Sequence, residues 1–302
     1  MNPLWRPSGP CDTGCLPGPD GAARAPARVR LARCAALCAV GLAGALPLAL
    51  LPLLPRARRA PVVAFWARAV LRATGVRLAV RGRPPRPGTL LVANHISWLD
   101  VVALLAVAPA RLVAKREVRR WPVIGVLASA AGTVFVDRAR PKSLPGTVTA
   151  VAAALRGGAV VAAFPEGTTA CGRAAGRFRP ALLQAAADAG APVQPVALSY
   201  RWADGRRTTV AAFLGADSLL RSVRRVVAAP GLTVGVRLTP ALFPAPGASR
   251  RVLARAAEAA VRVAEPRLRP PLRRRPVWAD LVSPASPREQ NQGSPRELDL
   301  AG

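Results

Sequence analysis

The sequence predicts an α/β fold, in which a mostly parallel central sheet is flanked by helices and preceded by an N-terminal membrane-associated helical segment. Three observations lead to this prediction. From residue 89 onward, short apolar runs alternate with longer helical stretches, which is typical of parallel strands buried on both faces. A long uncharged apolar stretch precedes them. A chain of 302 residues is also long enough to bury a sizeable core.

The N-terminal part has two sections. Residues 1–30 are rich in proline, glycine and arginine without periodicity, so we expect them to be disordered. The next section, 31–60, is expected to be apolar and membrane-spanning or re-entrant, because residues 34–55 carry no charge and are enough to cross a bilayer. Three prolines in its second half would interrupt a straight helix, which leaves a kinked span and an interfacial hairpin both open. A buried core helix is the alternative without a membrane.

Residues 61–265 are expected to form the folded domain, which begins with an amphipathic helix over 61–74 and a half-buried strand over 76–81. Further strands are expected at residues 90–93, 112–114, 133–136, 159–164, 193–198 and 232–238. Helices are expected at residues 98–107, 123–131, 143–155, 181–189, 218–227 and 251–263. Residues 266–302 are rich in proline and arginine and then in serine, so we expect an unfolded tail.

The charge balance indicates the kind of partner. The chain has 44 Lys and Arg residues against 15 Asp and Glu, a net charge of +29, so its surface will attract something anionic. Aromatic residues make up only 4% of the chain, which argues against nucleic acid as the partner. Arginines on both sides of the apolar segment favour anionic lipid head groups. We therefore expect an anionic membrane surface as a partner, and no nucleic acid.

The cysteines give little information about function. Cys11 and Cys15 form one CxxxC pair, Cys34 and Cys38 form another, and Cys171 stands alone. The odd number argues against a disulfide framework, and a chain with one histidine offers no convincing zinc set. We expect reduced thiols, no metal and no cofactor.

His95 is the only histidine, and it directly follows the apolar run 90–93, five positions before Asp100. Imidazole titrates near neutral pH, which suits a general base, and a nearby carboxylate can fix its tautomer. The residues from Ser97 to Asp100 also fit a helix capping box, in which Asp100 merely binds a backbone amide. On these residues alone, both interpretations stay open.

Two further motifs lie at predicted strand ends. The run 159–164 leads into Pro165-Glu166-Gly167-Thr168-Thr169, a plausible ligand-binding turn that is also compatible with a simple loop. Arg138 follows the run 133–136, where an arginine can clamp a phosphate or remain solvated.

In this order and spacing, the motifs resemble the glycerolipid acyltransferase family, whose best-known bacterial members are the 1-acylglycerol-3-phosphate acyltransferases. The family's first block, a histidine and an aspartate separated by four residues, matches His95 and Asp100. The later blocks match residues 132–138, 164–168 and 193–196, and the segment around Lys115 matches the stretch between the first two blocks. The resemblance covers roughly residues 61–240.

The resemblance implies an O-acyltransferase of phospholipid biosynthesis at the cell membrane, with its active site facing the cytoplasm. An acyl chain would pass from acyl-CoA or acyl-carrier protein to a lysolipid hydroxyl, most simply that of 1-acylglycerol-3-phosphate, to give phosphatidate. His95 would take the hydroxyl proton and Asp100 would orient the ring. The residues implied to bind the substrates are Arg138, Glu166, Gly167, Thr168 and Lys115.

Position 169 departs from the family pattern. Phosphatidate-forming members continue Glu-Gly-Thr with an arginine that meets the acceptor's phosphate, whereas Thr169 stands there in this chain. Relatives that acylate lyso-ornithine lipids also lack this arginine, so that acceptor or another lysophospholipid is the alternative. Arg173, Arg177 or Arg179 could supply the charge instead.

Two rival functions are a hydrolase that uses His95 on water and a catalytically dead, basic protein that binds membranes or nucleic acid.

Overall fold

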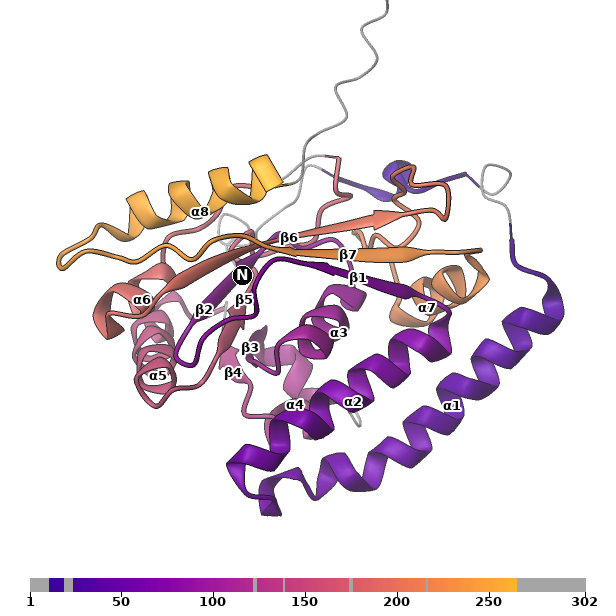
Figure 1. Ribbon diagram of the computed structural model, residues 1–302, viewed down its shortest axis with the longest axis horizontal. Helices are drawn as coiled ribbons and strands as arrows, with labels where there is room; N and C mark the ends of the chain where they lie inside the picture. Colours follow the sequence, from indigo (N-terminus) through magenta and orange to yellow (C-terminus); the bar gives the residue numbers. More distant parts are fainter. Residues whose placement is uncertain are drawn as a thin grey trace, which may run out of the picture. The chain divides into compact units, whose positions relative to one another are not determined.

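The computed structural model describes residues 11–18, 24–121, 124–137, 139–173, 176–215 and 217–264. It confirms the predicted fold class, because seven strands form a mostly parallel sheet with helices on both faces (Figure 1). The expected tail over 266–302 lies outside the described residues, as do parts of the stretch 1–30.

The sheet has the strand order β1-β7-β6-β2-β5-β3-β4. Strands β6, β2, β5, β3 and β4 are parallel to one another, whereas β7 pairs antiparallel with β6 and carries β1 parallel on its other side. The strand bounds are β1 (Arg77–Arg81), β2 (Leu90–Ala93), β3 (Arg111–Lys115), β4 (Val134–Val136), β5 (Val161–Ala163), β6 (Val193–Arg201) and β7 (Thr233–Leu238). The carboxyl ends of five neighbouring strands therefore meet at one edge, where open α/β sheets hold their reactive groups.

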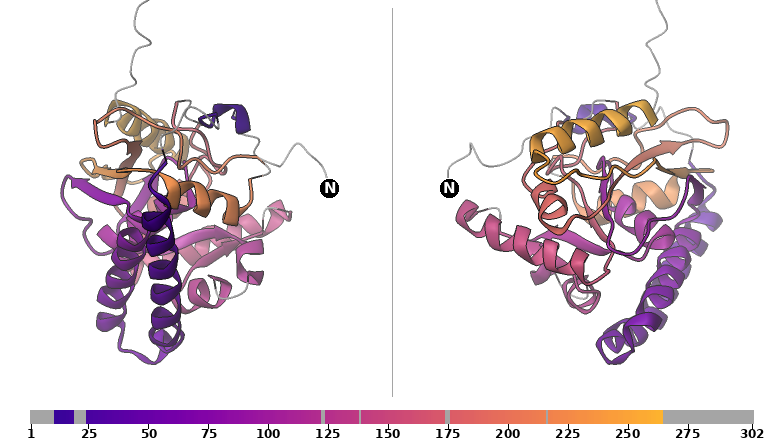
Figure 2. Two further views of the ribbon diagram at one scale, coloured as in Figure 1. Left: turned by 90° about the vertical axis from the view of Figure 1, so that its right-hand side faces the viewer. Right: turned by 60° about the vertical axis from the view of Figure 1, so that its left-hand side comes forward.

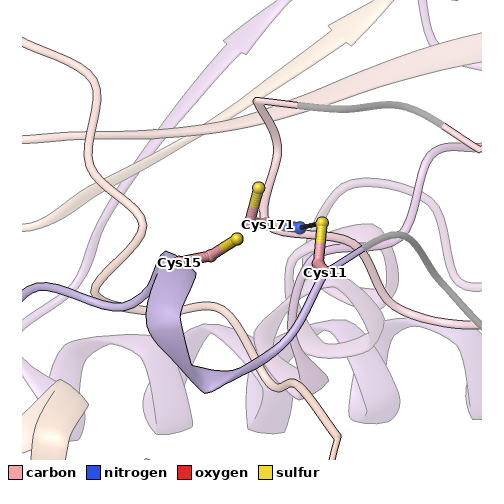
Figure 3. A group of neighbouring side chains, drawn as sticks. All are labelled: Cys11, Cys15 and Cys171. Carbon is pink, nitrogen blue, oxygen red and sulfur yellow. Dashed lines mark hydrogen bonds between the residues drawn. The ribbon is translucent and has the colours of Figure 1, made fainter.

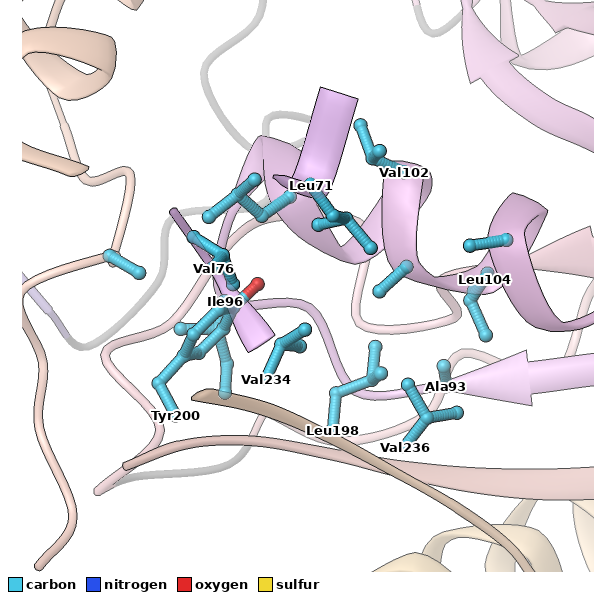
Figure 4. Packing of buried hydrophobic residues seen from close by; sticks show 14 of the residues in the cluster. Leu71, Val76, Ala93, Ile96, Val102, Leu104, Leu198, Tyr200, Val234 and Val236 are labelled. Atoms are coloured by element: carbon cyan, nitrogen blue, oxygen red, sulfur yellow. The ribbon is translucent and has the colours of Figure 1, made fainter. Parts of the chain in front are cut away.

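Strand β2 lies in the middle of the sheet, and its four residues are fully buried. Its side chains alternate between two cores, as strand geometry requires: Leu91 and Ala93 pack on one side, and Leu90 and Val92 on the other. Figure 4 shows part of the first core, which contains Ala93 of β2, Leu198 of the neighbouring β6 and Val236 of β7. An apolar run without alternation is thus explained by burial on both faces.

Two sets of helices cover the sheet. Helices α2 (Arg56–Thr74), α3 (Trp98–Val107) and α7 (Leu219–Ala228) pack on the first core. Helices α5 (Leu144–Arg156), α6 (Leu183–Ala189) and α8 (Arg250–Ala264) pack on the second. The remaining elements are α4 (Ile124–Ala130), η4 (Arg116–Arg120) and η5 (Pro141–Ser143).

Most predicted boundaries agree with the structure, and α3 occupies the predicted residues 98–107 because its capping box fixes where it starts. Helix α2 differs, since it begins at Arg56 rather than at residue 61, with Pro55 as its N-cap and Pro61 inside it. Strand β6 also continues past the predicted residue 198 to Arg201.

The apolar segment forms the first arm of a helical hairpin. Helix α1 (Ala27–Ala49) continues through Pro47, the short η3 (Leu51–Leu53) turns the chain, and α2 runs back beside α1 (Figures 1 and 2). Helices α1 and α2 thus form an antiparallel hairpin, while the way the apolar segment meets a membrane stays a prediction. Within the described residues, α1 is the one helix long and apolar enough to cross a membrane, with a mean hydropathy of 1.6 over Ala27–Pro47. Only 6% of that window is buried, so α1 is not a core helix.

The base of the hairpin is anchored to the domain. The Arg33 guanidinium donates hydrogen bonds to the carbonyls of Val227 (2.8 Å) and Ala229 (2.9 Å) at the end of α7. Earlier in the chain, where we expected disorder, the structure describes residues 11–18, which include the short 3₁₀ turn η2 (Thr13–Cys15). The side chains of Cys11, Cys15 and Leu16 pack against the first core.

Candidate active site

His95 and Asp100 meet in the turn between β2 and α3. His95 Nδ1 lies 2.9 Å from Asp100 Oδ2. That same oxygen accepts hydrogen bonds from the backbone amides of Ile96 (2.5 Å) and Ser97 (2.8 Å), and the capping box is complete. The two interpretations of the sequence therefore describe one arrangement, in which the helix cap seats the carboxylate that faces the imidazole.

The second carboxylate oxygen is bound by Tyr200, a residue that sequence reasoning did not select. Tyr200 lies on β6, and its hydroxyl donates to Asp100 Oδ1 at 2.6 Å. Burial, together with the neighbouring Asp100 carboxylate, raises the pKa of Tyr200 well above its ordinary value of 10.0, so the phenol keeps its proton. Tyr200 is the only tyrosine, and it lies near the end of β6, two residues after the apolar run 196–198. A buried phenol usually has a hydrogen-bond partner. A lone tyrosine next to a predicted buried strand was therefore the sequence signal that could have identified this residue.

The tautomer of His95 follows from its partner. Asp100 is fully buried and, as a carboxylate, can only accept, so the hydrogen between the two groups belongs to Nδ1. Nε2 is then left with a lone pair. The ring stacks on Phe164 from the end of β5, with the centroids 3.9 Å apart and the planes at 17°. The His95 side chain is 21% exposed, which leaves the ring accessible while its orientation is fixed.

The peptide backbone around His95 is tied to both neighbouring strands. The amide side chain of Asn94 pairs with Leu198 on β6, accepting from its N–H (2.7 Å) and donating to its carbonyl (2.9 Å). On the β5 side, Glu166 Oε2 accepts from the His95 amide (3.3 Å), and the Ala170 amide donates to the His95 carbonyl (2.8 Å). Asn94 thereby continues the sheet ladder beyond the end of β2.

The predicted substrate-binding residues differ in their distance from His95 and in their exposure to solvent. Glu166 is only 5% exposed and holds the backbone of His95, while Gly167 turns the chain with φ at 74° and Thr168 is half-buried. Lys115 is exposed at the end of β3, on the same sheet edge as His95 but with β5 between them. Strand spacing places that edge position roughly 10 Å from the His95 turn. Arg138 lies outside the described residues.

The Thr169 side chain links the loop after β5 to the segment after β6. Its hydroxyl donates to the carbonyl of Phe213, whose own amide donates to the carbonyl of Ile96 (2.9 Å). The resemblance to phosphatidate-forming relatives places an arginine at this position. Here the Thr169 hydroxyl is instead hydrogen-bonded to the segment that follows β6. Arg173, Arg177 and Arg179 are exposed in the loop after it.

Several known acyltransferases are similar to this chain. Residues 77–199 match the profile of the family described as Acyltransferase. The chain is 38% identical over 240 residues to the lyso-ornithine lipid O-acyltransferase of Pseudomonas aeruginosa, which covers 78% of this chain and 92% of that protein. It is also 38% identical over 184 residues to the 1-acyl-sn-glycerol-3-phosphate acyltransferase of Neisseria gonorrhoeae. That match covers 60% of this chain and 71% of the Neisseria protein.

Among solved structures, the fold is similar to that of the 1-acyl-sn-glycerophosphate acyltransferase from Thermotoga maritima. The TM-score is 0.58 at 19% sequence identity, over 80% of this chain and 96% of that one. With the extended match to the Pseudomonas relative, these comparisons establish that the chain belongs to the acyltransferase family.

Proposed function

We propose that this protein is a membrane-bound O-acyltransferase that moves an acyl chain from an acyl thioester to a lysolipid hydroxyl, with His95 as the general base. The observation that carries this proposal is the His95 ring, which is held by Asp100 through Nδ1 and by Phe164 through stacking while it stays partly exposed. The lysolipid acceptor is supported by the names of the relatives.

The reaction follows from these groups. Nε2 of His95 takes the proton of the acceptor hydroxyl as its oxygen attacks the thioester carbonyl, and Asp100 stabilises the imidazolium that forms. The carbon–sulfur bond then breaks, and the departing thiolate receives the proton from the imidazolium. Because a thiol has a pKa near ~8.5, it leaves without strong acid assistance. Acyl-CoA and acyl-carrier protein are the two donors that fit this chemistry.

For the acceptor we propose a lyso-ornithine lipid. Thr169 replaces the arginine of the phosphatidate-forming members, and its hydroxyl is bound to Phe213 rather than presented to a head group. The relative from Pseudomonas aeruginosa, whose name states this acceptor, covers more of the chain than the Neisseria protein does. 1-Acylglycerol-3-phosphate is the second candidate, because the exposed Arg173, Arg177 and Arg179 would suit a phosphate.

For the membrane we propose that the hairpin contacts the bilayer through α1, with the active site on the cytoplasmic side. Leu42 and Leu46 of α1 lie one helical turn apart and are 80% and 66% exposed. Exposed leucines on a helix with this hydropathy fit a lipid contact, and the net charge of +29 suits anionic head groups.

The catalytic assignment predicts a graded series of losses. His95→Ala should lower kcat by about 10²–10⁴-fold, since a positioned base contributes that much. Asp100→Asn should lower it by at least about 100-fold, because the amide no longer fixes the tautomer. Tyr200→Phe keeps the carboxylate and serves as the matched control, with a loss of about tenfold or less. Circular dichroism and vesicle binding check each variant. Unchanged turnover in His95→Ala would refute the role of His95.

The acceptor assignment predicts a preference that initial rates can measure. With labelled acyl-CoA or acyl-carrier protein as donor, kcat/KM for lyso-ornithine lipid should exceed that for 1-acylglycerol-3-phosphate by at least about tenfold, because the acceptor site is expected to discriminate between the two head groups. An equal or higher value for the phosphate acceptor would establish the second candidate instead. Release of fatty acid without any acceptor would mark the protein as a hydrolase.

The membrane contact predicts a position-specific effect of charge. Leu42→Asp together with Leu46→Asp should weaken binding to anionic vesicles by at least about tenfold, since burying aspartate in lipid is costly. Val263→Asp, at an exposed apolar position of α8, is the control and should bind like the unaltered protein. Sedimentation with vesicles measures both. Equal binding by all three proteins would contradict the proposed contact.

A further inference from the structure

Three cysteines that are far apart in the sequence come together beside the active-site loop. The Sγ atoms of Cys11, Cys15 and Cys171 all lie within 4.8 Å of one another (Figure 3). Cys15 ends the N-terminal turn η2 and Cys11 directly precedes its N-cap Asp12, whereas Cys171 lies in the loop between β5 and α6. Their spacing in the sequence gave no indication of this cluster, because the third member is 160 positions from the first.

Hydrogen bonds hold the N-terminal segment against the domain and against the loop that carries Cys171. The Thr209 hydroxyl donates to the Cys15 carbonyl at 2.7 Å, and the Asp12 side chain accepts from Gly14 to cap η2. Two of the sulfur atoms accept backbone hydrogen bonds: Cys11 from the Cys171 amide (3.3 Å) and Cys171 from the Arg173 amide (3.4 Å). Metal-bound ligands are commonly supported by such outer hydrogen bonds.

The distances suit a soft metal ion. A tetrahedral zinc site with Zn–S bonds of ~2.3 Å brings its sulfur atoms to about 3.8 Å from one another. The cysteines lie within 4.8 Å, so small rotations about their side-chain bonds would reach this geometry. A disulfide would use two of the three thiols, whereas a cation can use all three.

Basic side chains lie beside the three cysteines, and they suit a divalent cation bound as a thiolate complex. Three thiolates on such an ion leave one net negative charge, and Arg173 and Arg207 line the cavity of about 30 Å³ next to Cys171.

We propose that Cys11, Cys15 and Cys171 bind a thiophilic divalent cation of the Zn²⁺ type, with the fourth position left to solvent or another small ligand. Binding converts three thiols into three thiolates and releases three protons to solvent, without any change of oxidation state. The ion would fasten residues 11–16 to the loop after β5. Because the Ala170 amide in that loop donates to the His95 carbonyl, the ion would also steady the catalytic turn.

Cobalt binding tests this inference with the full-length protein, purified in detergent under reducing conditions. Co²⁺ should bind once per chain and give the sulfur-to-cobalt charge-transfer band and visible bands of a tetrahedral thiolate site, and Zn²⁺ should displace it. Changes in outer hydrogen bonds already cost about 10–100-fold in metal affinity. Cys11→Ser, Cys15→Ser and Cys171→Ser should therefore each weaken binding by more than about 100-fold.

The second CxxxC pair provides the matched control. Cys34 and Cys38 are exposed on α1, so the double variant Cys34→Ser/Cys38→Ser should bind Co²⁺ like the unaltered protein. Cys171 is buried, and if its variant misfolds, the Cys11 and Cys15 variants carry the test alone. The proposal is overturned by an absent charge-transfer band, by binding that depends on Cys34 and Cys38, or by a disulfide in the cluster that intact mass detects under the same conditions. Acyl transfer is not the readout, so this result is independent of the proposed reaction.

Discussion

The buried carboxylate of Asp100 is the group on which the rest of the site depends. It accepts hydrogen bonds from His95, Ile96 and Ser97 on one oxygen and from Tyr200 on the other. These donors come from the turn after β2 and from β6, so one side chain connects the His95 ring, the start of α3 and the neighbouring strand. Each buried donor left without its acceptor would cost about 1–3 kcal/mol, and the arrangement therefore persists as a unit.

The sheet supplies the position of this carboxylate. Asn94 extends the pairing between β2 and β6 past the end of β2, and the Thr169–Phe213–Ile96 chain of hydrogen bonds holds the turn from outside. The turn that carries His95 is thus attached on both sides before any substrate arrives. Such preorganisation is what a general base needs, because its geometry relative to the reacting hydroxyl decides its effect.

Local signals predicted much of this fold. The apolar runs 90–93 and 193–198 indicated central strands because burial on both faces removes alternation, and Ser97 with Asp100 fixed the start of α3. The hairpin turn was left open because prolines mark an interruption but not the direction in which the chain continues. Tyr200, the Thr169 hydrogen bond and the cysteine cluster depend on residues about 40 to 160 positions apart, and no local pattern encodes such contacts.

The proposed reaction requires that Asp100 hold His95 with its proton on Nδ1 and its lone pair on Nε2. Because His95 is the only histidine, ¹⁵N labelling of histidine gives an unambiguous NMR signal from this ring. In the neutral ring, Nδ1 should show the shift of a protonated nitrogen and Nε2 that of an unprotonated one, and Asp100→Asn should abolish this preference. A ring protonated on Nε2, or a mixture that Asp100→Asn leaves unchanged, would contradict this role of Asp100.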